Sequence, residues 1–150
     1  MTPTLHTTIA LQADLEQLRG AGQALRALLE QAAAPEDTLG ACELAVQELL
    51  TNIVNHACHG EASQVIRVEL TVEGGPGGAA LTVRTWDNGT PAELDLDNIA
   101  MPDPLALQVG GYGLALMHAL VDRLEYTRQG AQNCWVLVKS FTPLQSQARS

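Results

Sequence analysis

The sequence predicts a small α/β sandwich, that is, a two-layer α+β fold in which helices cover a sheet. Three observations support this. Residues 7–59 carry a short strand pattern followed by two helix patterns. Residues 66–72 alternate with the period of two that is typical of a half-buried strand, and a second strand follows at 80–86. Residues 114–140 carry another helix and a hairpin. A chain of 150 residues fits one domain and can bury roughly two thirds of its unfolded surface.

The N-terminal elements follow from capping and helical periodicity. Residues 7–11 are expected to form a short strand, and Asp14 can cap a helix over residues 15–33. Pro35 begins a second helix that runs to about His59, because proline tolerates the first turn and acidic residues after it favour the positive end of the helix dipole. The apolar side of the first helix is formed by Leu15, Leu18, Leu25, Leu28 and Leu29.

The C-terminal half is predicted to contain a hairpin, one more helix and a second hairpin, in that order. Strands are predicted at 66–72 and 80–86, joined by a glycine-rich hairpin loop at 74–78. A long loop follows up to Gly110, and loops of this length are often functional lids. A helix at 114–122 and a hairpin of strands at 124–128 and 133–140 complete a domain over residues 1–142, and residues 143–150 are expected to form a disordered tail.

Composition excludes several classes of protein. The formal charge of −9, without a run of Lys or Arg, disfavours direct binding to DNA or RNA. Three widely spaced cysteines predict no disulfide framework and favour a reducing compartment. No apolar run is long enough to span a membrane and no signal-peptide pattern is present, so a cytoplasmic location without membrane attachment is expected.

The second helix carries an unusual polar face. Its polar residues are Glu48, Asn52, Asn55, His56 and His59. A solvated helix back is the alternative interpretation, but solvated faces usually mix charges, and this face has no Lys or Arg and a single acid. We therefore expect it to line a groove. Glu48 and Asn52 lie one turn apart, so a carboxylate and an amide oxygen could converge on one hydrated cation or one reacting hydroxyl.

Two glycine-containing segments point to a nucleotide. Residues 110–113, Gly-Gly-Tyr-Gly, precede an apolar helix, where backbone N–H groups and the helix dipole favour phosphate. Asp87-Asn88-Gly89 follows a strand, and a buried Asp87 could accept a hydrogen bond from the exocyclic amine of a purine. Taken singly, the first segment could be a tight turn and the second a plain β-turn. Neither fits a Walker loop or a Rossmann fingerprint.

Zinc and serine-nucleophile sites are not expected. His56, Cys58 and His59 are possible zinc ligands by type, but on one helix Cys58 points away from the two histidines and no fourth ligand has useful spacing. No serine lies in a G-x-S-x-G elbow.

Three motifs in order resemble the GHKL (Bergerat) ATPase superfamily. They are Glu-Leu-Ala-Val-Gln-Glu-Leu-Leu-Thr-Asn-Ile-Val-Asn-His at 43–56, Asp-Asn-Gly-Thr-Pro at 87–91, and Gly-Tyr-Gly-Leu-Ala-Leu-Met at 111–117. Within that group the chain is most similar to the bacterial anti-sigma-factor serine/threonine kinases, whose Leu-Met-x-x-Leu-x-Asp ending is present at 116–122. The resemblance covers nearly the whole chain and implies a mixed, mostly antiparallel sheet with helices on one face.

The resemblance assigns roles to individual residues. Asn52 matches the family's magnesium ligand, and Glu48 matches the carboxylate that activates the incoming hydroxyl as a general base. Asp87 matches the residue that reads adenine, and Gly89 would let the backbone approach the base. His56 is expected in or behind the groove. The remaining cofactor-binding positions are Gly111, Tyr112, Gly113 and Leu114.

The function implied by the resemblance is an ATP/Mg²⁺-dependent kinase with ADP as product. Its expected partners are an anti-anti-sigma protein of the STAS type as substrate, a sigma factor that it sequesters, and a second copy of itself in a homodimer. Many relatives place Arg or Lys near the terminal phosphate, whereas residues 92–112 contain neither. They carry acids instead, namely Glu93, Asp95, Asp97 and Asp103. This departure implies slow transfer or a cation supplied by the partner.

Two other functions stay open. One is a binding module that senses ATP or ADP and switches a partner without turnover, which the cation-free segment favours. The other is a detached catalytic domain of a histidine kinase. It is disfavoured because no long helical pair with a phosphoacceptor histidine precedes the Glu48–Asn52 motif, and His6 lies in a polar segment where simple exposure is expected.

Overall fold

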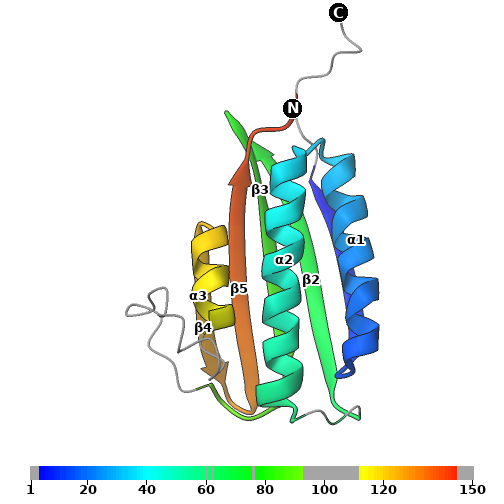
Figure 1. Ribbon diagram of the computed structural model, residues 1–150, viewed down its shortest axis with the longest axis vertical. Helices are drawn as coiled ribbons and strands as arrows, with labels where there is room; N and C mark the ends of the chain where they lie inside the picture. The colour runs from blue at the N-terminus through cyan, green and yellow to red at the C-terminus, as the bar shows by residue number, and fades with distance from the viewer. Residues whose placement is uncertain (1–3, 60, 62, 76, 93–111, 145–150) are drawn as a thin grey trace, which may run out of the picture.

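The computed structural model describes residues 4–59, 61, 63–75, 77–92 and 112–144. An N-terminal strand precedes two helices, and strands then alternate with one further helix (Figure 1). In chain order the elements are β1 (Leu5–Gln12), the 3₁₀ turn η1 (Leu15–Gln17), α1 (Leu18–Gln31), α2 (Glu36–Asn52), the π-helical turn η2 (Ile53–Ala57), β2 (Val65–Gly75), β3 (Gly78–Asp87), α3 (Tyr112–Leu120), β4 (Arg123–Gln129) and β5 (Gln132–Phe141).

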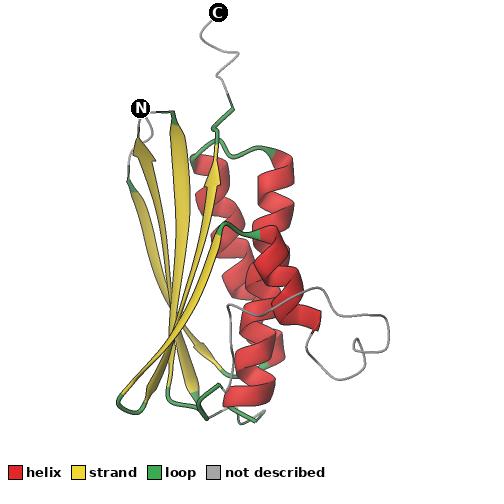
Figure 2. Ribbon diagram, turned by 90° about the vertical axis from the view of Figure 1, so that its left-hand side faces the viewer, coloured by secondary structure: helices red, strands yellow, loops and turns green. Residues whose placement is uncertain are grey.

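The five described strands form one sheet in the order β1-β2-β3-β5-β4, with all four neighbouring pairs antiparallel. Figure 2 shows all three helices on the same side of this sheet. The expected two-layer fold, with a mostly antiparallel sheet and helices on one face, is confirmed. The central strand β3 ends opposite the start of β5, where Asp87 pairs with Asn133.

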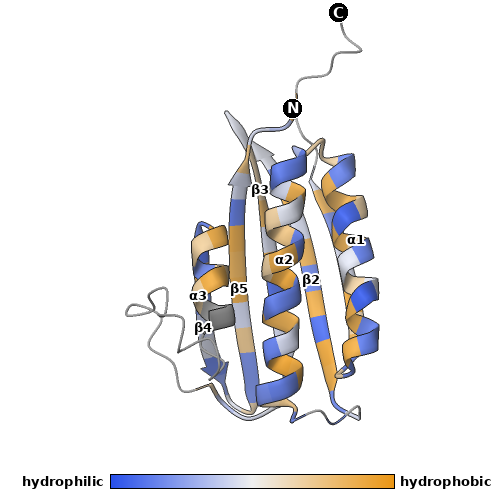
Figure 3. Ribbon diagram, in the orientation of Figure 1, coloured by the Kyte–Doolittle hydropathy of each residue, from blue (hydrophilic) through white to orange (hydrophobic). Residues whose placement is uncertain are grey.

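The core lies between the sheet and the helices. Along β2, Ile66, Val68, Leu70 and Val72 are fully buried, so the period-two prediction for this strand is confirmed. From the helix layer, Leu25, Leu49 and Met117 are also fully buried. Figure 3 shows hydrophobic and hydrophilic residues alternating along α1 and α2. Burying one such aliphatic side chain contributes roughly 1.5–3 kcal/mol relative to leaving it exposed, which explains how a chain poor in aromatic residues holds this fold.

The first helix differs from its prediction at both ends. Asp14 does cap it, since its Oδ1 accepts a hydrogen bond from the Glu16 N–H at 2.9 Å. The first turn is 3₁₀, however, and Leu15 is 53% exposed rather than part of the apolar side. The helix ends at Gln31, because Ala33 adopts a positive φ of 57°.

The second helix begins after Pro35 as predicted, but its regular part is shorter than predicted. α-Helical geometry ends at Asn52 and continues as a π turn, in which the Cys58 N–H donates to the Ile53 carbonyl at 2.9 Å. His59 then takes a positive φ of 52°, which ends the helical path. π turns within helices occur frequently at functional sites.

The remaining boundaries shift by a few residues. α3 spans Tyr112–Leu120 instead of 114–122, because the chain turns at Val121 and Asp122 into β4. The predicted loop falls largely on 93–111 and the tail on 143–150; residues 93–111 and 145–150 lie outside the described residues. The Leu144 N–H donates to the Ala33 carbonyl at 2.7 Å, so the start of the expected tail is bonded to the domain. None of the described helices is long and apolar enough to cross a membrane.

Candidate functional site

Asp87 occupies the end of β3 and is 1% exposed. Its Oδ1 accepts hydrogen bonds from the Gly89 N–H at 2.9 Å and from the Asn133 side-chain amide at 2.8 Å. Among the described residues Oδ2 has no hydrogen-bond partner. A buried carboxylate oxygen without a partner is costly, so this atom fits a ligand that brings a donor to it. An exocyclic amine of a purine meets that requirement.

Thr85, two residues before Asp87 on β3, also has a buried oxygen without a partner among the described residues. It is fully buried, and its Oγ1 is the other buried side-chain oxygen without a partner in the described part of the chain. Side chains two residues apart on a strand share one face, so Thr85 and Asp87 both point toward the helix layer. The end of β3 therefore presents two unsatisfied polar atoms to that layer.

Asn133 was missed by the sequence analysis and is a central residue of the site. It is 1% exposed on β5 and bonds to Asp87 across the sheet. Tyr126 and Arg128 of β4, also missed, donate to its Oδ1 at 2.5 and 3.0 Å. The available signal was an Asn at the start of a strongly apolar strand, a position where Asn is disfavoured unless its polar groups are bonded.

Gly89 joins the Asp87 turn to the end of the second helix. A Cβ atom at this position would lie 2.4 Å from the Ala57 carbonyl oxygen, so only glycine fits. The next residue continues the contact, because the Thr90 N–H donates to the same carbonyl at 2.8 Å. The structure thus supplies a reason for glycine, close approach to η2, that differs from the expected approach to a base.

His59, from the predicted polar face, takes part in the same junction. Its Nε2 lies 2.7 Å from the Thr90 Oγ1. Burial raises the pKa of the neighbouring Cys58 thiol to about 11, and the charges of Asp87 and Glu61 act in the same direction. A neutral thiol is a poor metal ligand, and the described residues contain no cluster of three or more His, Cys, Asp or Glu side chains able to hold a metal ion.

Glu48 and Asn52 lie where the helical pattern placed them. Both are half-buried on the last turns of α2, one turn apart, and neither side chain makes a hydrogen bond to another described residue. Asn52 is the last α-helical residue before η2, and His56 is exposed on η2 itself. Because η2 contacts Gly89 and Thr90, the helix that carries Glu48 and Asn52 ends against the Asp87 turn.

The glycine-rich segment enters the third helix. Tyr112, Gly113 and Leu114 form the first turn of α3, two residues earlier than predicted, whereas Gly111 lies outside the described residues. α3 packs against α2. The first N–H groups of any α-helix lack partners within the helix, so this end of α3 has the chemistry that binds phosphate.

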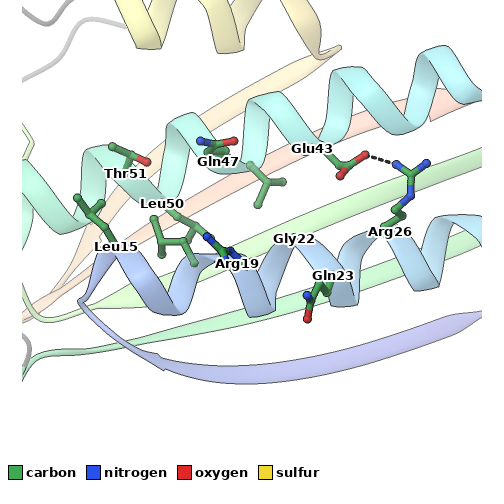
Figure 4. A pocket seen from close by; sticks show the side chains of 11 residues that line it. Leu15, Arg19, Gly22, Gln23, Arg26, Glu43, Gln47, Leu50 and Thr51 are labelled. Atoms are coloured by element: carbon green, nitrogen blue, oxygen red, sulfur yellow. Dashed lines mark hydrogen bonds and ion pairs between the residues drawn. The ribbon is translucent and has the colours of Figure 1, made fainter.

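A separate hollow lies between α1 and α2 and contains none of the predicted site residues. It encloses about 590 Å³, and an ion pair of Arg26 with Glu43 crosses one end of it (Figure 4). Its lining residues are Leu15, Leu18, Arg19, Gly22, Gln23, Arg26, Glu43, Val46, Gln47, Leu50 and Thr51. This hollow is distinct from the polar junction at Asp87.

Comparison with known protein families identifies the family to which the chain belongs. The family description "Histidine kinase-like ATPase domain" matches residues 11–139. The chain belongs to the histidine kinase-like ATPase family. The resemblance to the GHKL superfamily is thereby confirmed, and membership of this ATPase family implies ATP binding. The matched range contains Glu48, Asn52 and Asp87.

Individual relatives show which members of the family the chain is similar to. The chain is 30% identical over 127 residues to the serine-protein kinase RsbW of Listeria monocytogenes, covering 79% of this chain and 78% of that protein. RsbW of Listeria innocua is 31% identical over the same length. This family member is therefore a distant homologue of the RsbW anti-sigma serine kinases.

Two solved structures share the fold. The RsbU and RsbW domains of a Mycobacterium tuberculosis protein superimpose with a TM-score of 0.60 at 21% identity, covering 97% of this chain and 35% of that one. This ATPase-family chain thus spans about a third of that longer protein. A chain of the SiaB–SiaC complex from Pseudomonas aeruginosa superimposes with a TM-score of 0.54 at 16% identity, covering 90% and 89% of the two chains.

Proposed function

We propose that this chain is an ATP- and Mg²⁺-dependent protein serine/threonine kinase that acts as an anti-sigma factor. The observation that carries the proposal is the buried Asp87, one oxygen of which has no partner among the residues that the structure describes. Asp87 lies at a turn held against the end of the helix that bears Glu48 and Asn52. The 30% identity to a serine-protein kinase supports the same chemistry.

The nucleotide would lie between the end of β3 and the polar side of α2. Asp87 Oδ2 would accept a hydrogen bond from the adenine amine, and the first turn of α3 would face the phosphates. Asn52 would hold magnesium, which suits a site with one amide ligand because the ion keeps several waters and binds phosphate oxygens as well. When bound, magnesium neutralises negative charge on the phosphates.

Glu48 would act on the attacking hydroxyl. As the serine or threonine oxygen of the substrate forms its bond to the γ-phosphorus and ADP leaves, the carboxylate of Glu48 accepts the hydroxyl proton. The half-buried position of Glu48, without an ion-pair partner among the described residues, leaves the carboxylate available for this step. His56, exposed on η2, would border the groove without a direct role in this transfer.

The proposed substrate is a small STAS-type anti-anti-sigma regulator, and the proposed sequestered partner is a sigma factor. The names of the RsbW relatives and the presence of a partner protein in the SiaB–SiaC complex support a protein-binding role. The acidic charge of −9 supports a protein rather than a nucleic acid as partner. A cytoplasmic homodimer is the form we propose for the active protein.

Replacement of Glu48 tests the kinase proposal. With γ-labelled ATP and a purified STAS-domain regulator, Glu48→Ala should lower phosphoserine formation by about 100-fold or more and leave calorimetric ATP binding unchanged. Gln47→Ala, at an exposed neighbouring position of the same helix, is the matched control and should keep full transfer. Equal labelling by Glu48→Ala would remove Glu48 from the assigned role.

A second function is favoured by one specific feature, the sequence of residues 92–112, which has acids and no Lys or Arg. A nucleotide-sensing switch without turnover needs no cation at the terminal phosphate. It predicts that ATP and ADP change the affinity for the regulator while no labelled product forms. Robust transfer in the labelling assay would exclude it.

A further inference from the structure

The two ends of the Asn133 side-chain amide bond to different kinds of partner. Its Nδ2 faces only acceptors, namely Asp87 Oδ1 at 2.8 Å, the Thr90 carbonyl at 3.0 Å and the Gly89 carbonyl at 3.3 Å. Its Oδ1 faces only donors, the Tyr126 hydroxyl at 2.5 Å and Arg128 Nη1 at 3.0 Å. This sorting defines the orientation of the amide, and it requires a residue with both a donor and an acceptor end.

The same bonds determine which oxygen of Asp87 is free. Oδ1 is saturated by the Gly89 N–H and Asn133, whereas Oδ2 has no partner among the described residues. The terminal torsion of an aspartate is otherwise soft, so without Asn133 the carboxylate could rotate to other angles, at which neither oxygen keeps the direction that Oδ2 has here. The turn is held by the same group, because Arg128 donates to the Gly89 carbonyl at 2.8 Å and Tyr126 accepts from the Ala92 N–H at 2.9 Å.

We propose that Asn133 is a positioning residue that presents Asp87 Oδ2, a carboxylate oxygen without a partner among the described residues, as the acceptor for the purine base and thereby sets selectivity for adenine over 6-oxopurines. This inference rests on the proposed function. A carboxylate oxygen matches the exocyclic amine of adenine, whereas a 6-oxopurine would turn a second acceptor toward it and leave both unsatisfied. Sites built to bond a substrate N–H reject analogues that lack it far more strongly than apolar pockets can.

The near-isosteric variant Asn133→Asp separates this role from simple structural support. At neutral pH it places a second carboxylate against Asp87 Oδ1 and removes the donor. We expect the wild-type protein to bind ATP about 100-fold or more tightly than ITP, whose base lacks the amine, and the variant to retain a ratio of less than about 10. If Asn133 had a purely structural role, the substitution would weaken the binding of ATP and of ITP equally, and the ratio of the two affinities would not change.

The pH dependence of the ATP/ITP ratio is the second readout. Two carboxylates in contact share a proton when the pH is lowered, and that proton would restore a donor to Asp87 Oδ1. The ratio of Asn133→Asp should therefore rise as the pH falls from about 8 to about 5, while the wild-type ratio stays nearly constant. The titratable and charged groups around Asp87 are Tyr126 and Arg128 of β4 and Cys58 and His59 at the end of η2. They are shared by both proteins.

A second variant covers the case in which Asn133→Asp does not fold. Tyr126→Phe removes one of the two donors that orient the Asn133 amide, and the ring keeps its packing on Trp135, 4.8 Å away between centroids. The ATP/ITP ratio should fall by about 3- to 10-fold, the value of one hydrogen bond. Unchanged ratios in every folded variant would overturn the role of Asn133, whereas a wild-type protein that binds neither nucleotide would overturn the proposed function instead.

Discussion

At the scale of single residues, the site depends on one glycine and one carboxylate. Gly89 lets the turn after β3 approach η2, and Asp87 is buried behind that turn. One of its oxygens is bonded, and the other has no partner in the described part of the chain. The same turn therefore contacts the end of the second helix and bonds one oxygen of Asp87. A change at Gly89 is expected to disturb both.

Gly89→Ala should lower the free energy of unfolding by about 1–3 kcal/mol, because its Cβ would lie 2.4 Å from the Ala57 carbonyl oxygen and the backbone must shift. Urea unfolding measures this. Gly40→Ala is the control: Gly40 lies within α2, a Cβ there meets nothing within 4 Å, and the change should stabilise the helix by up to about 1 kcal/mol. Equal stability of Gly89→Ala and the wild type would contradict the contact.

At the scale of elements, the second helix has two functions. Its apolar side supplies the core with residues such as Leu49 and Ile53, and its polar side carries Glu48 and Asn52. The change to π geometry after Asn52 ends the regular helix where the β3 turn arrives, so the Ala57 carbonyl is available to the Thr90 N–H. The junction of helix and turn is thus made by backbone groups.

Burial of Cys42 on this helix predicts a loss of stability at high pH. Burial raises the pKa of its thiol to about 11, with a smaller opposing effect from Lys139, while an unfolded thiol titrates near 9. Between these values the unfolded state binds fewer protons than the folded state, so the free energy of unfolding falls as the pH rises. Urea unfolding between pH about 8 and about 11 should show this fall.

The Cys42→Ala variant provides the comparison for that titration. It loses some stability at every pH because a cavity forms, but its slope between pH about 9 and about 11 should be shallower. Cys58, whose pKa is also raised to about 11, and Cys134, whose pKa is raised by burial, both contribute to the slope that remains. A slope identical to that of the wild type would show that Cys42 ionises freely in the folded protein.

At the scale of the whole molecule, one layer of helices covers one sheet, and the proposed nucleotide site lies at a single end of it. The contacts of Gly89 and Thr90 with Ala57 join the turn after β3 to η2 at this end. The hollow between α1 and α2 belongs to a different part of the surface (Figure 4). Ligand binding at the Asp87 end should therefore stabilise both the sheet and the helix layer.

ATP with magnesium at about 100 times its Kd should raise the thermal midpoint by about 5–10 °C, because binding to the folded state alone adds about 2.7 kcal/mol. Differential scanning fluorimetry measures the shift. Asp87→Asn keeps the shape of the side chain but can turn a donor toward the adenine amine, so its midpoint should hardly respond to ATP. An equal response of this variant would remove Asp87 from base recognition.

Local patterns were enough for most elements and for part of the site. The alternation at 66–72 lies within β2, and the helical period placed Glu48 and Asn52 on one polar face of α2. These predictions depend only on residues within a few positions of one another, where periodicity is a direct consequence of backbone geometry. The π turn after Asn52 and the exposure of Leu15 were not predicted, because packing at the helix ends decides them.

Membership of the ATPase family and the identity of the polar motifs could be read from the chain alone, since each motif is contiguous. The partner of Asp87 could not, because Asn133 is 46 residues away and becomes its neighbour only when β5 pairs with β3. The contact of Gly89 with Ala57 likewise required the folded layers. Residue types define which hydrogen bonds are chemically available, and the tertiary structure decides which of them form and which carboxylate oxygen remains free.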